Sequence, residues 1–321
     1  MFGKILVSGG AGFIGSHVVE LLLSEKEVEQ VVVIDNFFTG SLDNLKAFLE
    51  DSKLKVIEGD IRDKELVKRF VKEADFIFHQ AAVVSVPLSI EKPDLTNDVN
   101  VNGTINLLEA ALNSNVERFV YASSCAVYGN PTSLPINEKS ELDPLSPYAA
   151  SKLAAESYCR AFYESYGLKT VCLRYFNVYG PRQAGENYSG VISIFMRQAL
   201  QGQPLTIRGD GKQTRDFVFV KDVARANLLA SLKEEAIGKV LNVGTGKAIT
   251  INELAEKISE MVGHRAGFKY IPLLKGEVMH SVADISLARE ILGYSPTFGI
   301  EDGLKETFYW FVNVKGRRRG A

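Results

Sequence analysis

Tyr148 and Lys152 lie four residues apart in the segment SPYAASK at 146–152. Pro147 favours a helix start there, and a spacing of four places the phenol and the ammonium on one helix face. A tyrosine hydroxyl has an ordinary pKa of about 10, so it acts as a base near neutral pH only when a positive charge stabilises its phenolate. The spacing therefore indicates a general base with an electrostatic partner, although a surface tyrosine beside a solvated lysine shows the same pattern.

Ser123 and Ser124 favour the catalytic interpretation of this pair. Both follow the expected strand 118–122, and the carboxyl ends of strands line the ligand crevice of an open α/β sheet. The sequence thus predicts that Ser124, Tyr148 and Lys152 converge as a proton-transfer site.

A glycine-rich turn, GGAGFIG at 9–15, follows the first expected strand, 4–8. Glycines permit a tight turn, close approach of the backbone to a pyrophosphate, and close packing of the next helix on the sheet. The helix N-terminus then offers free N–H groups and the positive end of its dipole to phosphate. A plain glycine-rich turn is the alternative. The expected dinucleotide contacts in this turn are Gly9, Gly12, Phe13, Ile14 and Gly15.

Two acids follow later strands, and both suit an adenosine. Asp35 ends the second strand 20 residues after Gly15, where a carboxylate accepts hydrogen bonds from a ribose diol. A carboxylate there repels a 2′-phosphate, and no arginine lies within 36–41, so NAD is preferred to NADP. Asp60, in GDIRD at 59–63, is expected either to meet the adenine amino group or to cap the next helix.

Short β-branched runs alternate with amphipathic segments, which is typical of parallel strands joined by helical crossovers. The expected strands are 4–8, 31–35, 55–58, 76–79, 118–122 and 170–174, and the expected helices are 13–24, 61–71, 99–112, 147–166, 191–201, 221–232, 251–261 and 286–292. Glycines and prolines interrupt the pattern after residue 174. We therefore expect an α/β protein: a Rossmann-type doubly wound parallel sheet in residues 1–174, and mainly a smaller mixed α/β substrate lobe in residues 175–321, with the chain free to cross back between them.

The composition limits the functions that fit. Of 321 residues, 46% are hydrophobic and 24% charged, and the net charge of -2 gives no attraction to nucleic acid or to a membrane surface. The cysteines, Cys125, Cys159 and Cys172, are odd in number and lack C-x-x-C spacing, so we expect neither disulfides nor a metal site. We expect a cytoplasmic protein, because no leader pattern and no apolar stretch of about 18 to 20 residues is visible.

Together these motifs resemble the extended short-chain dehydrogenase/reductase family. The resemblance rests on GGAGFIG at 9–15, HQAA at 79–82, SSCAVYG at 123–129 and SPYAASK at 146–152. The second half is similar to sugar-nucleotide 4-epimerases of the UDP-hexose type, through RYFNVYGPRQ at 174–183, GDGKQTRDFVFVKDVA at 209–224 and HSVADISLAREILGYSP at 280–296. The resemblance covers nearly the whole chain.

The resemblance implies an NAD-dependent enzyme that inverts C4 of a UDP-sugar. Tyr148 would take the proton of the 4-hydroxyl as hydride leaves C4 for NAD, Ser124 would hydrogen-bond the same oxygen, and the 4-keto sugar would rotate before hydride returns. UDP-glucose and UDP-galactose are expected first, and UDP-GlcNAc and UDP-GalNAc close behind, because Ser281 leaves room for an N-acetyl group. A homodimer through helices 99–112 and 147–166 is also implied.

The resemblance also implies further contacts of individual residues with the cofactor and the substrate. Asn177 and Arg215 are placed against the UDP diphosphate as an amide donor and a charged fork, with a turn-capping asparagine and a surface ion pair as alternatives. Leu274 stands where a second arginine is usual, and Lys275 is a weaker substitute. The remaining implied cofactor contacts are Asn36, Ile61, Gln80, Ala81, Ala82, Asn100, Ser123, Tyr148, Lys152 and Tyr175, and the implied substrate contacts are Ser85, Ser124, Tyr148, Asn177, Val191, Arg215, Lys275 and Ser281.

Other functions stay open at this point. Related dehydratases and decarboxylases carry acids after the Ser/Thr, where this chain has Cys125 and Ala126, so both reactions are weakened. Cys125 is expected to be a packed side chain rather than an acid or base. A UDP-glucuronate 4-epimerase remains an alternative, because Arg182 or Lys275 could meet a carboxylate. Outside enzymes, an NAD-sensing regulatory protein could share the fold, although an intact catalytic set argues against it.

Overall fold

The computed structural model describes residues 3–183, 190–263, 265–273 and 278–318. Its largest element is a seven-stranded sheet of order β11-β6-β5-β4-β1-β2-β3, in which every neighbouring pair is parallel. The strands are β1 (Gly3–Ser8), β2 (Val28–Asp35), β3 (Leu54–Glu58), β4 (Phe76–His79), β5 (Arg118–Ser124), β6 (Thr170–Tyr175) and β11 (Val240–Val243). The strand order reverses between β1 and β4, which is the switch point where doubly wound sheets bind ligands.

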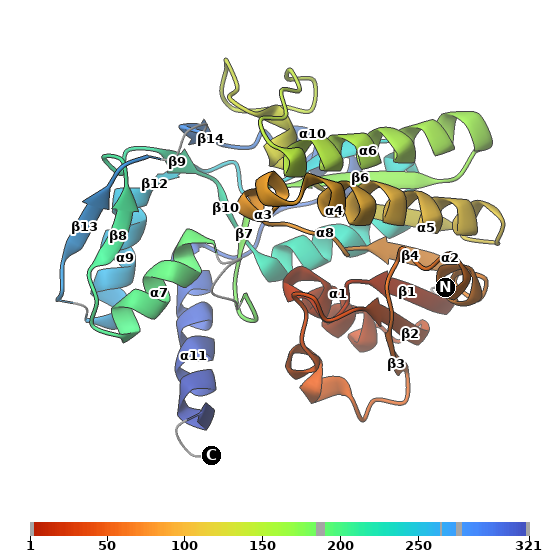
Figure 1. Cartoon of the computed structure of the whole chain (residues 1–321), viewed down its shortest axis with the longest axis horizontal. Helices are drawn as coiled ribbons and strands as arrows, with labels where there is room; N and C mark the ends of the chain where they lie inside the picture. Colours follow the sequence, from red (N-terminus) through yellow and green to blue (C-terminus); the bar gives the residue numbers. More distant parts are fainter. Residues whose placement is uncertain (1–2, 184–189, 264, 274–277, 319–321) are drawn as a thin grey trace.

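Helices cover both faces of this sheet (Figure 1). They are α1 (Phe13–Ser24), α8 (Val220–Leu232) and α10 (Ser286–Leu292) on one face, and α2 (Lys64–Val71), α5 (Gly103–Leu112) and α6 (Pro147–Tyr166) on the other. Side chains alternate along a strand, so Val7 packs under the first set of helices and Leu6 under the second. Because helices cover both faces, the central strands are mostly apolar, whereas the edge strand β3 carries Lys55 and Glu58 and is only half-buried.

A smaller mixed part lies beside the sheet, at the left of Figure 1. It contains α7 (Val191–Leu200), α9 (Ile251–Val262), α11 (Ile300–Arg318) and the paired strands β8 (Leu205–Arg208) and β13 (Phe268–Ile271). A separate apolar cluster that includes Phe195, Leu254 and Ile258 fills its interior. Short strands run next to it: β7 (Asn177–Tyr179), β9 (Thr214–Arg215), β10 (Phe217–Phe219), β12 (Ile249–Thr250) and β14 (His280–Ser281).

The second half of the chain contributes to both parts of the molecule. β11 pairs with β6 at the edge of the large sheet, and α8 packs against α1. The chain therefore leaves the large sheet after β6, returns for α8 and β11, and leaves again for α9. Within the described ranges, no helix is both long and apolar enough to span a membrane.

The predicted α/β fold class is confirmed, and so are the six predicted strands. The sequence does not predict β11, because four residues show no distinct period, nor α11, α3 (Val86–Glu91) and α4 (Pro93–Asn97). The helix predicted at 61–71 begins only at Lys64, because the Asp63 carboxylate caps it. The helix predicted at 99–112 is wrong in its first turn, which is part of a π-helical segment, Asp98–Asn102.

Glu156 of α6 and Arg174 of β6 form a buried ion pair. Arg174 Nε donates to Glu156 Oε2 over 3.0 Å and Arg174 Nη2 donates to Oε1 over 2.5 Å. Ser123 Oγ donates to the same carboxylate over 2.7 Å, and Arg174 Nη1 donates to Tyr128 Oη over 2.8 Å. Both side chains are buried, so each charge needs the other to offset the cost of its desolvation. The ion pair and its hydrogen bonds thereby fix α6 against β5 and β6.

We expect Glu156→Ala to lower the free energy of unfolding by about 3 to 5 kcal/mol, because it leaves the Arg174 guanidinium buried without a counter-charge. Urea unfolding followed by circular dichroism measures the change. The control is Glu164→Ala on the same helix, whose partner Arg160 is exposed and 3.9 Å away, and it should cost less than about 0.5 kcal/mol. Equal losses in the two variants would contradict this account.

Candidate active site

A cavity of about 500 Å³ opens at the carboxyl ends of the central strands. It brings the glycine turn and the serine, tyrosine and lysine of the predicted catalytic set to one place. The predicted residues that line it are Gly9, Gly12, Phe13, Ile14, Gly15, Asp35, Asn36, Asp60, Ile61, Gln80, Ala81, Ala82, Ser123, Ser124, Tyr148, Lys152 and Tyr175. Its volume is in the range of cofactor and small-molecule sites.

The glycine turn is too tightly packed for side chains. Gly9 has a φ of +71°, and a Cβ there would lie 2.6 Å from the backbone of Ala81. A Cβ on Gly15 would lie 2.1 Å from the carbonyl oxygen of Gly9. Gly12, the N-cap of α1, supplies no capping side chain, so the first turn of the helix offers its N–H groups to the cavity side. The turn therefore fits the pyrophosphate of a dinucleotide.

Asp35 joins two loops around the cavity. Its Oδ2 accepts the Ala11 N–H over 2.9 Å and its Oδ1 accepts the Phe37 N–H over 2.8 Å. Burial raises the pKa of Asp35, and these backbone hydrogen bonds oppose the rise. The carboxylate thus holds the glycine turn next to the loop after β2, where a ribose would lie in the predicted role.

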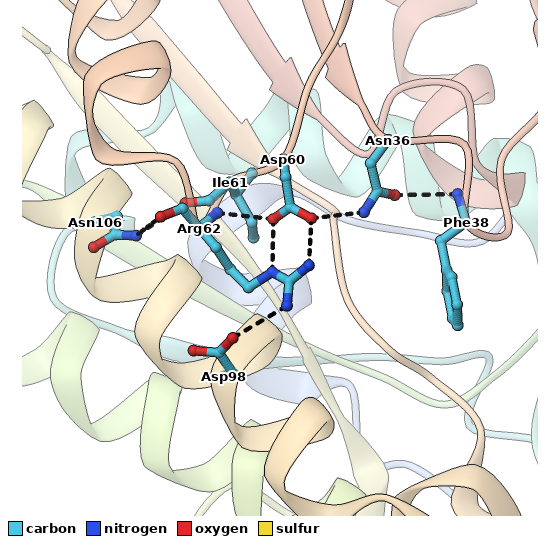
Figure 2. Close-up of polar contacts among 7 residues, drawn as sticks. All are labelled: Asn36, Phe38, Asp60, Ile61, Arg62, Asp98 and Asn106. Atoms are coloured by element: carbon cyan, nitrogen blue, oxygen red, sulfur yellow. Dashed lines mark hydrogen bonds and ion pairs between the residues drawn. The ribbon is translucent and has the colours of Figure 1, made fainter.

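Asp60 is held by a bidentate pair of hydrogen bonds from Arg62 (Figure 2). Arg62 Nε and Nη2 donate over 2.9 and 2.8 Å, and Asn36 Nδ2 donates over 3.0 Å. The hydrogen bonds from Arg62 lower the pKa of Asp60 to about 2, so the carboxylate is an acceptor only. The alternative prediction, that Asp60 caps the next helix, is wrong because Asp63 does so. The adenine contact remains a prediction.

The same network reaches the π-helical segment (Figure 2). Arg62 Nη1 donates to Asp98 Oδ2 over 3.1 Å. Two residues further along the segment, Asn100 is buried and is not among the lining residues. Its side-chain amide pairs with the N–H and carbonyl of Val83 over 2.7 and 3.0 Å and donates to Ser151 Oγ over 2.9 Å. Asn100 therefore supports the cavity wall and the helix that carries Lys152.

Ser124 ends β5, and Tyr148 and Lys152 lie on consecutive turns of α6. Burial raises the pKa of Tyr148 to about 12, and a hydrogen bond with Ser124 opposes the rise. Lys152 Nζ donates to the carbonyl of Ala122 over 2.8 Å, and burial lowers the pKa of Lys152 to about 7. Burial therefore penalises the charged form of each group, and a role of Lys152 in stabilising a Tyr148 phenolate remains a prediction.

Two residues predicted on the substrate side meet through strand pairing. Ser281 of β14 lies opposite Arg215 of β9 in a parallel pair. Ser281 is buried and hydrogen-bonds Cys125, which follows Ser124. Burial raises the pKa of Cys125 to about 12 and the side chain packs against the core, so the prediction of a packed cysteine is confirmed.

The residues that line the cavity do not include five predicted substrate contacts, which are Ser85, Asn177, Val191, Arg215 and Ser281. Ser85 caps α3 by accepting the Leu88 N–H over 3.1 Å, and Asn177 Nδ2 donates to the Asp216 carbonyl over 3.2 Å. Arg215 Nη1 donates to the carbonyls of Thr214 and Met279. Val191 begins α7. Lys275, like Leu274, lies outside the described residues.

Several lining residues are absent from the prediction. Arg62 stands inside the GDIRD motif, whose spacing could have indicated it, whereas loop residues such as Phe38 and Asn44 carry no periodic signal. The lining residues outside the predicted cofactor and substrate contacts are Ile34, Phe38, Thr39, Ser41, Asn44, Gly59, Arg62, Val83, Val84, Leu95, Val99, Ala122, Phe176, Val178, Arg182 and Gln183, of which Arg182 is predicted only as a contact to a uronate.

The doubly wound sheet, the glycine turn and the serine, tyrosine and lysine set together define a dinucleotide-dependent enzyme of the short-chain dehydrogenase/reductase type. Residues 5–244 match the model of the NAD dependent epimerase/dehydratase family. The chain belongs to this family, and NAD is its cofactor.

Similar proteins of this family act on sugar nucleotides. A putative UDP-glucose 4-epimerase of Methanocaldococcus jannaschii is 42% identical over 96% of this chain and 98% of its own length. The structure of a UDP-N-acetylglucosamine 4-epimerase from Methanobrevibacter ruminantium, in complex with UDP-N-acetylmuramic acid, has a TM-score of 0.92 and 39% identity over 97% of this chain and 98% of that one. The UDP-glucose 4-epimerase of Thermotoga maritima with UDP-glucose has a TM-score of 0.92 and 38% identity, covering 97% and 99%. Others are named UDP-glucuronate 4-epimerase and UDP-glucuronic acid decarboxylase, so the family includes several reactions.

We expect Arg62→Met to raise the pKa of Asp60 towards its ordinary value of about 4, because the bidentate donor is lost. The wild-type carboxylate should stay ionised down to about pH 3, whereas the variant carboxylate should titrate near pH 4. Carboxyl NMR measures both. Lys64→Met, which removes a cation paired with Glu109 instead, is the control and should leave Asp60 unchanged. An Asp60 that remains ionised at pH 3 in Arg62→Met would refute the assignment.

Proposed function

We propose that this chain is a UDP-hexose 4-epimerase that interconverts UDP-glucose and UDP-galactose and also accepts UDP-GlcNAc and UDP-GalNAc. The observation that carries the proposal is that Ser124, Tyr148 and Lys152 line one cavity with the glycine turn. Bound NAD supplies a hydride acceptor and then a hydride donor.

The side chains of the chain perform the proton chemistry in this proposal. Tyr148 takes the proton of the 4-hydroxyl while Ser124 hydrogen-bonds the same oxygen, and Lys152 stabilises the phenolate before the transfer. The proton then returns from Tyr148 to the oxygen of the 4-keto sugar. The cavity wall includes Val83 and Phe176, whose apolar surfaces form no directional bonds and so favour rotation of the sugar between the two hydride transfers.

The small side chains near Ser124 support acceptance of a C2 N-acetyl group. Ser281 is buried beside Cys125, and neither fills the volume that a tyrosine would. The Methanobrevibacter neighbour, whose structure holds an N-acetylated UDP-sugar, aligns over 97% of this chain. This likeness supports the dual range of substrates.

A uronate substrate receives less support from the described residues. Arg182, one of two cations considered for a carboxylate, donates to Glu20 Oε2 over 2.6 Å and to the Ser16 carbonyl over 3.1 Å, so its charge is already matched. Dehydration and decarboxylation need an acid or base after Ser124. Cys125, with its raised pKa, and Ala126 offer none at neutral pH.

We expect the purified protein to convert UDP-glucose and UDP-GlcNAc to their C4 epimers without added NAD, as resolved by NMR. Tyr148→Phe should lower kcat by about 10²- to 10⁴-fold because the base is lost, with the NAD content unchanged. Tyr158→Phe, on the exposed face of the same helix, is the control and should keep full activity. Full activity in Tyr148→Phe would refute the assigned base. Unchanged sugars, even with added NAD, would favour UDP-glucuronate or the NAD-sensing alternative.

We expect Ser281→Tyr to abolish turnover of UDP-GlcNAc while leaving that of UDP-glucose within about tenfold, since a bulky pocket residue discriminates by one substituent. Ser281→Ala should keep both activities. The test is to measure kcat/KM for UDP-glucose and UDP-GlcNAc in both variants. Equal losses for the two substrates in Ser281→Tyr would contradict the assignment of Ser281 to the pocket for the C2 substituent.

A further inference from the structure

The Lys152 ammonium has two neighbours on β5. Its Nζ donates to the Ala122 carbonyl over 2.8 Å and lies over the face of the Tyr121 ring, 5.1 Å from the ring centroid. Lys152 is 4% exposed and Tyr121 is 1% exposed, so water hardly screens the contact. The face of an aromatic ring carries partial negative charge and attracts a desolvated cation within about 6 Å.

We propose that Tyr121 is a positioning residue whose ring keeps Lys152 protonated while Lys152 supports the Tyr148 phenolate. A ring suits this task better than a carboxylate, because a carboxylate would cancel the charge that the phenolate needs. The ring stabilises the ammonium and leaves its formal charge intact. The inference rests on the proposed function, because it gives Tyr121 a part in the proton transfer assigned to Tyr148.

The Tyr121 ring also contacts a second ring, that of the neutral His79. The ring of His79 on β4 lies 5.5 Å from that of Tyr121. Its two nitrogens are hydrogen-bonded to Ser8 Oγ over 2.7 Å and to Thr104 Oγ1 over 2.8 Å. Burial lowers the pKa of His79 to about 3, so no second cation competes with Lys152 for the ring.

Other titratable groups that face Tyr121 or Lys152 come from α6 and β6. Cys159 of α6 and Cys172 of β6 are buried, and the hydrogen bond to Cys159 together with burial raises the pKa of Cys172. Glu156 of α6 is paired with Arg174. Cys125, which follows Ser124, faces Tyr148, and burial raises its pKa to about 12. Both thiols with a raised pKa are therefore neutral and Glu156 is matched by Arg174, so none of these groups brings an uncompensated negative charge to Tyr148 or Lys152.

The Tyr121 ring affects where one proton is held, on Tyr148 or on Lys152. Tyr148 and Lys152 can hold it as phenol with amine or as phenolate with ammonium. The ring favours the second form, and a desolvated cation–π contact corresponds to roughly one pKa unit. Without the ring, the phenolate form should be about tenfold rarer.

The Tyr121 hydroxyl provides a matched control. Within the described part of the chain, its Oη is buried and has no hydrogen-bond partner. Tyr121→Phe therefore keeps the ring and removes no hydrogen bond. Tyr121→Met removes the ring and fills much of its space with a flexible apolar chain. Tyr121→Leu is a second ringless variant in case the first does not fold.

The first readout is the pKa of Lys152, followed by NMR of lysine labelled at its Cε carbon in the enzyme as purified, with Lys152→Met to assign the resonance. Burial lowers the pKa of Lys152 and raises that of Tyr148, so Lys152 loses its proton first and the ring acts on that step. We expect the pKa of Lys152 to be about one unit lower in Tyr121→Met and Tyr121→Leu than in Tyr121→Phe, because the ammonium loses the attraction of the ring. The kcat for epimerisation should be about tenfold lower at neutral pH, with KM within about twofold and NAD content unchanged.

Equal pKa values of Lys152 in the ringless and Phe variants, with unfolding curves showing that each is folded, would overturn the inference. A loss of activity in which KM rises and the pKa of Lys152 stays fixed would overturn it as well, because that is the result of a merely structural role. The titration needs no substrate. A protein that epimerises no sugar and still shows the shift would therefore refute the proposed function while supporting the role of Tyr121.

Discussion

Two consecutive turns of α6 are attached to the carboxyl end of β5, and the geometry of the candidate site follows from these attachments. Lys152 donates to the Ala122 carbonyl, and Glu156, one turn later, accepts from Ser123. A rigid strand and a rigid helix are thereby fixed at the residues next to Ser124. Sites on such elements hold their side chains more precisely than sites on loops.

The pKa shifts of the titratable side chains differ between the two ends of the cavity. At the catalytic end, burial raises the pKa of Tyr148 to about 12 and lowers that of Lys152 to about 7, so the lysine can gain or lose a proton near neutral pH. At the other end, hydrogen bonds from Arg62 keep the partly exposed Asp60 ionised. A group that moves protons needs a small difference between its charged and neutral forms, whereas a group that only binds benefits from a fixed charge.

The substrate side depends on a buried carboxylate that joins distant segments. Asp216 accepts the N–H groups of Thr245, Gly246 and Ala283 over 2.8, 2.9 and 3.1 Å. These contacts fix the chain where it passes between the large sheet and the smaller part, and they hold β9 and β14 in register beside Cys125. The position of Arg215 therefore depends on the contacts of the adjacent Asp216 as well as on its own hydrogen bonds.

The sequence by itself determined the doubly wound sheet, the glycine turn and the Ser124, Tyr148 and Lys152 set, because each has a local signal in strand period, glycine spacing or helix spacing. Only the tertiary structure decided that β11 completes the sheet and that Asp63, rather than Asp60, caps α2. The same holds for the Tyr121 ring under Lys152, which an alternating strand pattern presents simply as another buried aromatic. The pairing of β11 and the contact of Tyr121 with Lys152 join residues far apart in the chain, and no local period records such contacts. The cap on α2 is local, but two acids three residues apart offer the same signal, and only the backbone geometry selects Asp63.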